Sequence, residues 1–165
     1  MSEVVVRAMA HADLPAVHRL ERVLFPEDAW SEDMLREELD DQPRTRHYVV
    51  AEAPGGEIVG YAGLAAAGGQ ADVQTIGVRA DMRGAGVGAA LLAELMDEAV
   101  RRGSEAVFLE VRADNAGARR LYERFGFGEV GVRKRYYQPS DVDAIVMRRV
   151  LRRRPAGFTA DREDT

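Results

Sequence analysis

Arg83-Gly84-Ala85-Gly86-Val87-Gly88 is the most informative stretch of the chain, because it stands between a strand-type run and a helix-type run. Ala71–Val78 before it reads as a β-strand. The run after it places apolar residues on one helical stripe: Leu91, Leu92, Leu95, Met96 and Ala99. Gly103 is suited to end that helix. The stretch therefore predicts a tight turn that opens a helix, where unpaired backbone N–H groups point outward.

Those N–H groups predict an anion site. Glycine and alanine let phosphate oxygens approach the backbone, and the helix dipole favours negative charge, so a pyrophosphate fits well. The alternative is a glycine-rich loop that only connects the strand to the helix and binds no ligand. No Lys-Ser or Lys-Thr pair follows, as a Walker A ATPase loop requires, and the spacing Gly-x-Gly-x-Gly after a hairpin differs from the dinucleotide fingerprint.

The chain before this stretch is predicted to hold two helices and a hairpin. Asp13 is expected to cap a helix with an apolar stripe, and a second short helix starts at Ser31. The expected strands are Val4–Met9, His47–Ala53 and Ile58–Ala66, the last two joined by a turn at Pro54-Gly55-Gly56.

The chain after this stretch alternates strands and helices. The expected strands are Ala106–Val111, Phe127–Arg133 and Ala144–Val150. A helix is expected over Ala116–Phe125, capped by Asp114 or Asn115 and ended by Gly126. This order predicts an α/β (α+β) fold, a mixed sheet with helices on both faces.

Composition excludes several classes of protein. A chain of 165 residues fits one domain, and its lack of cysteine excludes disulfides, thiolate metal sites and a cysteine nucleophile. The three histidines show no ligand spacing, so no metal is expected. The net charge of −5 argues against nucleic-acid binding, and no apolar run is long enough to span a membrane. No secretory leader is recognised at the start, so we expect a cytoplasmic protein.

Glu110 interrupts the otherwise apolar run Val107–Val111. Burial there would raise the pKa of its carboxyl toward neutrality, which suits a general base that takes a proton from an ammonium group. The alternative is a solvent-facing residue on one wet face of the sheet, and the spacing does not choose between the two.

Tyr122 and Asn115 each allow two interpretations. Tyr122 lies on a helical stripe and can be a core aromatic, or its hydroxyl can protonate a departing thiolate as a general acid. Asn115 can be a helix cap alone, or a cap that also bonds a cofactor.

The motif Arg83-x-x-Gly86-x-Gly88, followed by Asn115, Leu121-Tyr122 and Phe125-Gly126-Phe127, resembles the acetyl-coenzyme A signature of the GNAT N-acetyltransferase superfamily. The resemblance covers about Val4–Val150 and implies a domain over residues 1–151. The polar stretch Thr159–Thr165 separately predicts a flexible tail, which we place at residues 152–165. It implies about seven strands splayed between the fourth and fifth, where the pantetheine arm of acetyl-CoA enters. The implied cofactor residues are Ile76, Gly77 and Val78 at the acetyl end, Arg83, Gly84, Ala85, Gly86, Val87, Gly88 and Ala89 at the pyrophosphate, and Asn115.

Within that superfamily, residues 109–115, 133–137 and 143–147 are similar to those of enzymes that acetylate the N-terminal alanine of a small-subunit ribosomal protein. The similarity implies that Glu110 accepts a proton and Tyr122 donates one. Tyr136 and Tyr137 would line the channel for the acceptor peptide, with Trp30 in a substrate-side loop. One departure is clear: the family's Phe-Pro-Trp-Ser run is interrupted here by Glu27-Asp28-Ala29, so the peptide preference is open.

The implied chemistry is a direct transfer. Without a cysteine to carry an acyl group, the amine would attack the thioester in a ternary complex, with the Val78 N–H polarising the carbonyl. An N-terminal amine, with a pKa of about 8, needs only a modest base. Two alternatives stay open. One is a small-amine acetyltransferase, and the other is a non-catalytic acyl-CoA-sensing module that needs neither Glu110 nor Tyr122.

Overall fold

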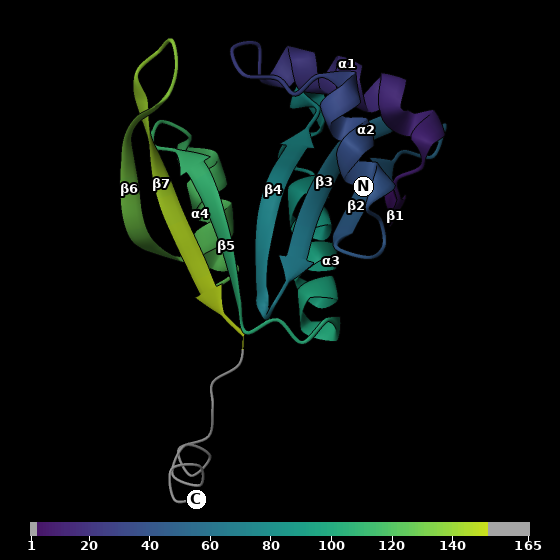
Figure 1. Cartoon of the computed structure of the whole chain (residues 1–165). Helices are drawn as coiled ribbons and strands as arrows, with labels where there is room; N and C mark the ends of the chain where they lie inside the picture. Colours follow the sequence, from purple (N-terminus) through teal and green to yellow (C-terminus); the bar gives the residue numbers. More distant parts are fainter. Residues whose placement is uncertain (1–2, 152–165) are drawn as a thin grey trace, which may run out of the picture.

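The computed structural model describes residues 3–151, so the expected tail at 152–165 lies outside the described part of the chain. Seven strands form one sheet in the order β1-β2-β3-β4-β5-β7-β6 (Figure 1). The strands are β1 (Val5–Ala8), β2 (Arg46–Glu52), β3 (Ile58–Ala67), β4 (Gln70–Val78), β5 (Ala106–Arg112), β6 (Gly128–Tyr137) and β7 (Val142–Val150). The helices are α1 (Leu14–Leu24), α2 (Glu32–Asp40), α3 (Val87–Arg101) and α4 (Ala116–Arg124), with short 3₁₀ turns η1 (His11–Asp13) and η2 (Ala80–Met82).

The sheet splits open between β4 and β5, which are its parallel neighbours. These two strands pair only through Gln70–Ala106, Ala71–Val107 and Asp72–Phe108. Beyond that point β4 runs on to Val78 and β5 to Arg112 without pairing, so the two halves of the sheet diverge as a V (Figure 1). The predicted mixed sheet, splayed between its fourth and fifth strands, is confirmed.

Helices cover both faces of the sheet, as predicted. On one face α3 packs against β1 to β4, and Tyr122 of α4 and Phe127 belong to the same hydrophobic core. On the other face α1 packs against β3 and β4, and α2 against β2, around a second core that contains Tyr48 and Tyr61. Among residues 3–151, no helix is both long and apolar enough to cross a bilayer.

Two glycines bring aromatic rings close to the sheet backbone on the α1 and α2 face. A Cβ atom at Gly63 would lie 2.2 Å from the ring of Tyr48, and one at Gly77 would lie 2.7 Å from the ring of Tyr61. The β3–β4 register shifts just after Gly63, and the Tyr48 hydroxyl donates to Gln74 Oε1 at 2.7 Å. These contacts fix the course of β4 toward its open end.

Three local predictions have different outcomes. Ser31 caps α2, because its Oγ accepts from the Met34 N–H at 3.1 Å. Asp13 does not cap α1 with its side chain; its carboxylate accepts from Arg7 and from the Ala10 N–H, because η1 runs directly into α1. The last hairpin is longer than predicted, because β6 continues past Arg133 and ends at Tyr137.

Candidate active site

The glycine turn presents open backbone N–H groups at the start of α3. Gly84 and Gly86 adopt left-handed conformations, with φ of 82° and 86°, which explains glycine at both positions. The first bond into the helix runs from the Ala90 N–H to the Gly86 carbonyl at 3.0 Å, so the N–H groups of residues 87–89 precede it. Gly86, the N-cap residue, has no side chain to accept from them. A Cβ at Gly84 or Gly86 would meet nothing within 4 Å, so an anion can approach this turn.

The glycine turn lies at the open end of the splay. A Cβ atom added to Gly88 would lie 3.4 Å from Leu121 Cδ2 on α4 and 3.6 Å from Val78 Cγ2 on β4. The side chain of Arg83 is exposed beside the turn. The first turn of α3 therefore sits against the end of β4 and against α4, and a molecule bound to its N–H groups can reach into the V.

The backbone of Val78 faces the gap between β4 and β5. The Arg79 N–H bonds to the Val59 carbonyl at 2.9 Å, and Val78 stands opposite Gly60. Hydrogen bonds alternate along an antiparallel pair, so the Val78 N–H points away from β3, toward the splay. This direction is the one that the predicted oxyanion donor requires, and Ile76 and Gly77 precede it on the same strand.

Glu110 is not buried, so of its two interpretations the desolvated carboxyl is wrong. Val107, Leu109 and Val111 alternate into the core, which leaves Glu110 on the opposite face of β5. Its side chain is 32% exposed, and Oε2 accepts from Arg133 Nη1 at 2.7 Å. The carboxylate is therefore a solvated, ion-paired group at the splay, which is the alternative that the spacing left open.

Tyr122 is a core aromatic, which is one of the two interpretations of its sequence position, and its role as a general acid stays a prediction. Its ring is buried and meets Phe127 edge to face, with centroids 6.1 Å apart. Burial, with a smaller contribution from Tyr137, raises the pKa of the Tyr122 hydroxyl, so the group stays protonated. Within residues 3–151 nothing accepts or donates a hydrogen bond at this hydroxyl. A core aromatic therefore carries a hydroxyl that is available to another molecule.

Tyr136 and Tyr137 form an aromatic pair beside Glu110. Their ring centroids are 5.1 Å apart in an edge-to-face arrangement. Arg133 lies over the Tyr136 ring at 4.7 Å, and Arg112 over the Tyr137 ring at 5.2 Å. Burial and, next, the charge of Glu110 raise the pKa of Tyr137 to about 12. The structure therefore brings these tyrosines together with Glu110.

The ambiguous helix cap is resolved in favour of Asn115. Its Oδ1 accepts from the Ala118 N–H at 3.1 Å, and Asp114 instead binds the Arg112 guanidinium at 3.0 Å. Capping is confirmed for Asn115, while its contact with a cofactor stays a prediction.

Trp30 is anchored by a residue that the sequence interpretation missed. Glu21 on α1 is only 2% exposed, and its carboxylate accepts from the Trp30 N–H at 3.0 Å and from the Tyr61 hydroxyl. Burial raises the pKa of Glu21. The sequence position of Glu21 could have indicated its burial, because Glu21 follows Val17 by four residues on the buried stripe of α1. It ties the loop that contains Trp30 to the aromatic ring that packs on Gly77.

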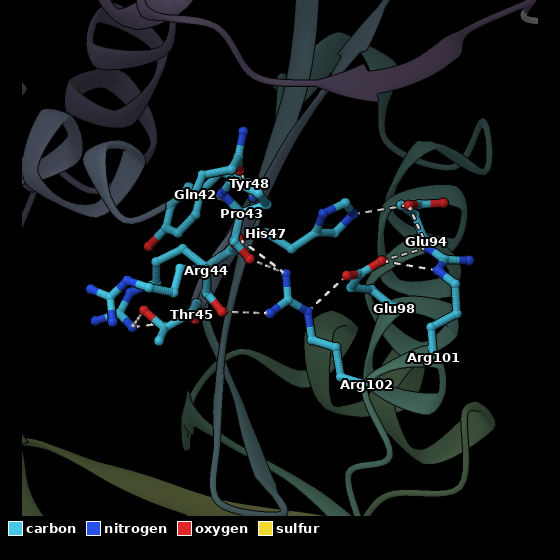
Figure 2. Close-up of polar contacts among 11 residues, drawn as sticks. Gln42, Pro43, Arg44, Thr45, His47, Tyr48, Glu94, Glu98, Arg101 and Arg102 are labelled. Carbon is cyan, nitrogen blue, oxygen red and sulfur yellow. Dashed lines mark hydrogen bonds and ion pairs between the residues drawn. The ribbon is translucent and has the colours of Figure 1, made fainter.

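A second polar cluster lies away from the glycine turn, in the second half of α3 (Figure 2). His47 Nε2 lies 2.9 Å from Glu94, and with Glu98 these side chains come close enough to share a cation. Arg101 and Arg102 already contact the two carboxylates at 2.7 to 3.3 Å. Arg102 also donates to the carbonyls of residues 43, 44 and 46. The cluster therefore ties α3 to the segment before β2.

Comparison with known proteins gives consistent results. The profile described as "Acetyltransferase (GNAT) family" matches residues 14–127. The chain is 42% identical to N-alpha-acetyltransferase RimI of Mycobacterium tuberculosis, over 88% of this chain and 92% of that protein. It is 34% identical to the [ribosomal protein bS18]-alanine N-acetyltransferase of Escherichia coli, over 86% and 94%. The crystal structure of the ribosomal-protein-S18-alanine N-acetyltransferase from Escherichia coli superposes with a TM-score of 0.81 at 30% identity, covering 92% of this chain and 96% of that one.

Proposed function

The chain belongs to the GNAT acetyltransferase family, and we propose that it moves the acetyl group of acetyl-CoA to the N-terminal amine of a protein. The proposed acceptor is the N-terminal alanine of a ribosomal protein, the group named for the relatives from Escherichia coli. The observation that carries the proposal is the convergence, at one splay, of the α3 N-terminus, the Val78 N–H, Glu110 and the tyrosine pair. Such a ribosomal acceptor would be met in the cytoplasm.

The residues around the splay fit acetyl-CoA. The open glycine turn suits its pyrophosphate, bound by the N–H groups of residues 87–89 at the start of α3 with Arg83 beside them. The pantetheine arm would pass between β4 and β5, near Asn115, and the acetyl end would lie along residues 76–78. The cofactor supplies a thioester whose carbonyl carbon is open to attack by an amine, and the Val78 N–H would stabilise the oxygen of the tetrahedral intermediate.

Glu110 is proposed to accept the proton that the acceptor amine must lose, directly or through a water molecule. Its exposed position beside Tyr137 leaves it reachable from the acceptor side. Arg133 donates a hydrogen bond to this carboxylate. The incoming ammonium group would replace Arg133 as the cationic partner of Glu110. An N-terminal amine has a pKa of about 8, over two units below that of a lysine side chain, so a larger fraction of it is already neutral at cellular pH.

Tyr122 is proposed to protonate the thiolate that leaves as the amide forms. Its ring is buried, and its hydroxyl is protonated and makes no hydrogen bond within residues 3–151. The chain has no cysteine to form an acyl-enzyme, so the amine would attack the bound thioester in a ternary complex.

The acceptor side favours a peptide over a small amine. Tyr136 is 46% exposed, and it and Tyr137 are held by stacked guanidinium groups, so the pair offers rigid aromatic walls for the first residues of a chain. Trp30 lies in the α1–α2 loop, and its backbone is fixed by the buried Glu21. Polyamines and other small amines have no peptide residues that could pack against these aromatic rings.

Steady-state rates of free-thiol release test the proposal. Three acceptors should be compared: an alanine-led peptide, the same peptide with a blocked N-terminus and an internal lysine, and spermidine. The proposal expects kcat/KM for the alanine-led peptide to exceed both others by about 10²-fold or more. Preference for spermidine would instead support a small-amine acetyltransferase. Binding of acetyl-CoA with no thiol released from any acceptor would support an acyl-CoA-sensing module.

A further inference from the structure

The loop between α1 and α2 contacts the opposite half of the splayed sheet. Ser140, in the turn between β6 and β7, donates its hydroxyl to Glu27 Oε1 at 3.0 Å. Glu27 follows α1, which packs on β3 and β4, whereas Ser140 belongs to the half formed by β5, β7 and β6. Figure 1 shows this loop and the β6–β7 turn at the same open end of the V. The contact therefore bridges the acceptor side of the splay.

Arg112 completes this bridge from β5. Its Nη1 lies 3.6 Å from Glu27 Oε1, and its Nη2 donates to Ser140 Oγ at 3.3 Å. The same guanidinium binds Asp114 at 3.0 Å and stacks over the ring of Tyr137. Arg112 stands two residues after Glu110, so the bridge is connected both to the tyrosine pair and to the proposed base.

Glu27, Arg112 and Ser140 are hereafter called the mouth clasp. In residues 3–151, no other side-chain hydrogen bond or ion pair joins the 25–31 loop to β5, β6, β7 or their connecting turn. The side chains of Glu27 and Arg112 are 38% and 24% exposed, so the clasp is reachable by solvent and can open.

We propose that the mouth clasp positions the acceptor peptide: Glu27, acting through Arg112 and Ser140, holds the 25–31 loop and the β6–β7 turn at the separation that a peptide N-terminus needs. The inference rests on the proposed function for its effect on peptide acetylation. Glu27 is a positioning residue, because it touches Arg112 and Ser140 and has no part in proton transfer. Its loss is expected to weaken peptide binding and to leave acetyl-CoA binding unchanged.

Steady-state kinetics of Glu27→Ala and Ser140→Ala test this role. Each substitution should raise KM for the alanine-led peptide about fivefold, while kcat and KM for acetyl-CoA change by less than about twofold. Glu27→Gln keeps an acceptor for Ser140 and should recover part of the loss. The matched control is Glu37→Ala, because Glu37 is exposed on the neighbouring helix α2 and should behave as wild type. The double variant should lose no more than Glu27→Ala alone, since removing Glu27 already breaks both contacts from the loop, to Ser140 and to Arg112.

Trp30 gives a second measurement that needs no substrate. It is the only tryptophan of the chain and lies three residues after Glu27, so its fluorescence reports the loop. Acrylamide quenching of Trp30 should increase about twofold in Glu27→Ala and in Ser140→Ala, and stay unchanged in Glu37→Ala. Unchanged quenching together with an unchanged peptide KM overturns the clasp. If the wild type acetylates no peptide, the proposed function fails, and Trp30 quenching alone decides whether the clasp exists.

Discussion

Glu110 Oε2 and Arg133 Nη1 are 2.7 Å apart, although their strands, β5 and β6, are separated by β7. The ion pair crosses β7 on the exposed side of the sheet, where Glu110 stands opposite Val146 and Arg133 opposite Ala144. It holds the carboxylate beside the splay without burying it. The proposed base is thus oriented by a partner that an acceptor ammonium can replace.

Glu110→Gln should lower kcat by about 10²-fold or more, because the amide cannot accept the proton of the acceptor amine. The affinity for acetyl-CoA, measured by calorimetry, should change by less than about twofold. Glu129→Gln, an exposed glutamate on β6, is the matched control and should keep wild-type turnover. Wild-type kcat in Glu110→Gln would remove Glu110 from the mechanism.

Tyr122→Phe should separate catalysis from packing. The substitution removes a hydroxyl that makes no hydrogen bond within the described residues, so the free energy of unfolding should change by less than about 1 kcal/mol. Turnover should fall about tenfold or more, because the thiolate loses its proton donor. Tyr48→Phe gives the contrast, since it breaks a hydrogen bond to Gln74 and should cost about 1 kcal/mol of stability. Unchanged turnover in Tyr122→Phe would leave Tyr122 as a core aromatic.

Gly86→Ala and Gly103→Ala form a matched pair that isolates the anion site. Both glycines have a positive φ, 86° and 76°, and both have open space where a Cβ would lie, so each substitution should cost about 1 to 2 kcal/mol in backbone strain. Only Gly86→Ala changes the turn before α3, and only this variant should weaken acetyl-CoA binding, by about tenfold. Equal acetyl-CoA affinity in the two variants, measured by calorimetry, would contradict the proposed pyrophosphate site.

Asp13 should make stability depend on pH in the acid range. Hydrogen bonds from Arg7 lower the pKa of the Asp13 carboxyl below its ordinary value of 3.8 in the folded protein. The folded state therefore binds fewer protons than the unfolded state, so this stabilisation is complete above pH 3.8 and is lost as the pH falls through the folded pKa. Because the pair is partly solvated, we expect the loss to be less than about 1 kcal/mol.

Urea unfolding between about pH 2.5 and pH 6 measures this loss. Asp13→Asn should remove part of the acid-range decline, whereas Asp33→Asn, an exposed aspartate on α2, should retain it. An identical decline in wild type and Asp13→Asn would show that Asp13 does not contribute.

Much of the fold was predictable, because periodicity and glycine placement are local signals. The stripe from Leu91 to Ala99 predicted α3, and Gly103 and Gly126 follow the ends of α3 and α4 in left-handed conformations. The extent of β6 was not predictable, since this edge strand is exposed along nearly its whole length and shows no apolar alternation.

The face of Glu110 could not be read from its neighbours. Phe108 lies on the same face of β5, half-buried beside the last β4–β5 pair, so the run Val107–Val111 reads as apolar throughout. Beyond this pair β4 and β5 diverge, so the same face of β5 is exposed to solvent at Glu110. Alternation alone does not reveal where a parallel pair ends.

Contacts between segments that lie far apart in the chain could not be predicted from the sequence. Glu27 and Ser140 are 113 residues apart, and no composition or spacing signal connects them. The buried Glu21 was detectable only as an acidic residue on an apolar stripe. Such contacts depend on how the α1–α2 loop and the last hairpin meet across the splay.

Tandem mass spectrometry of a peptide product tests the central claim most directly. The purified chain should be incubated with acetyl-CoA and an alanine-led peptide that also contains an internal lysine. The account predicts one acetyl group on the α-amino nitrogen, none on the lysine, and a greatly reduced yield with Glu110→Gln. Acetylation at the lysine alone, or no acetylated peptide at all, would contradict it.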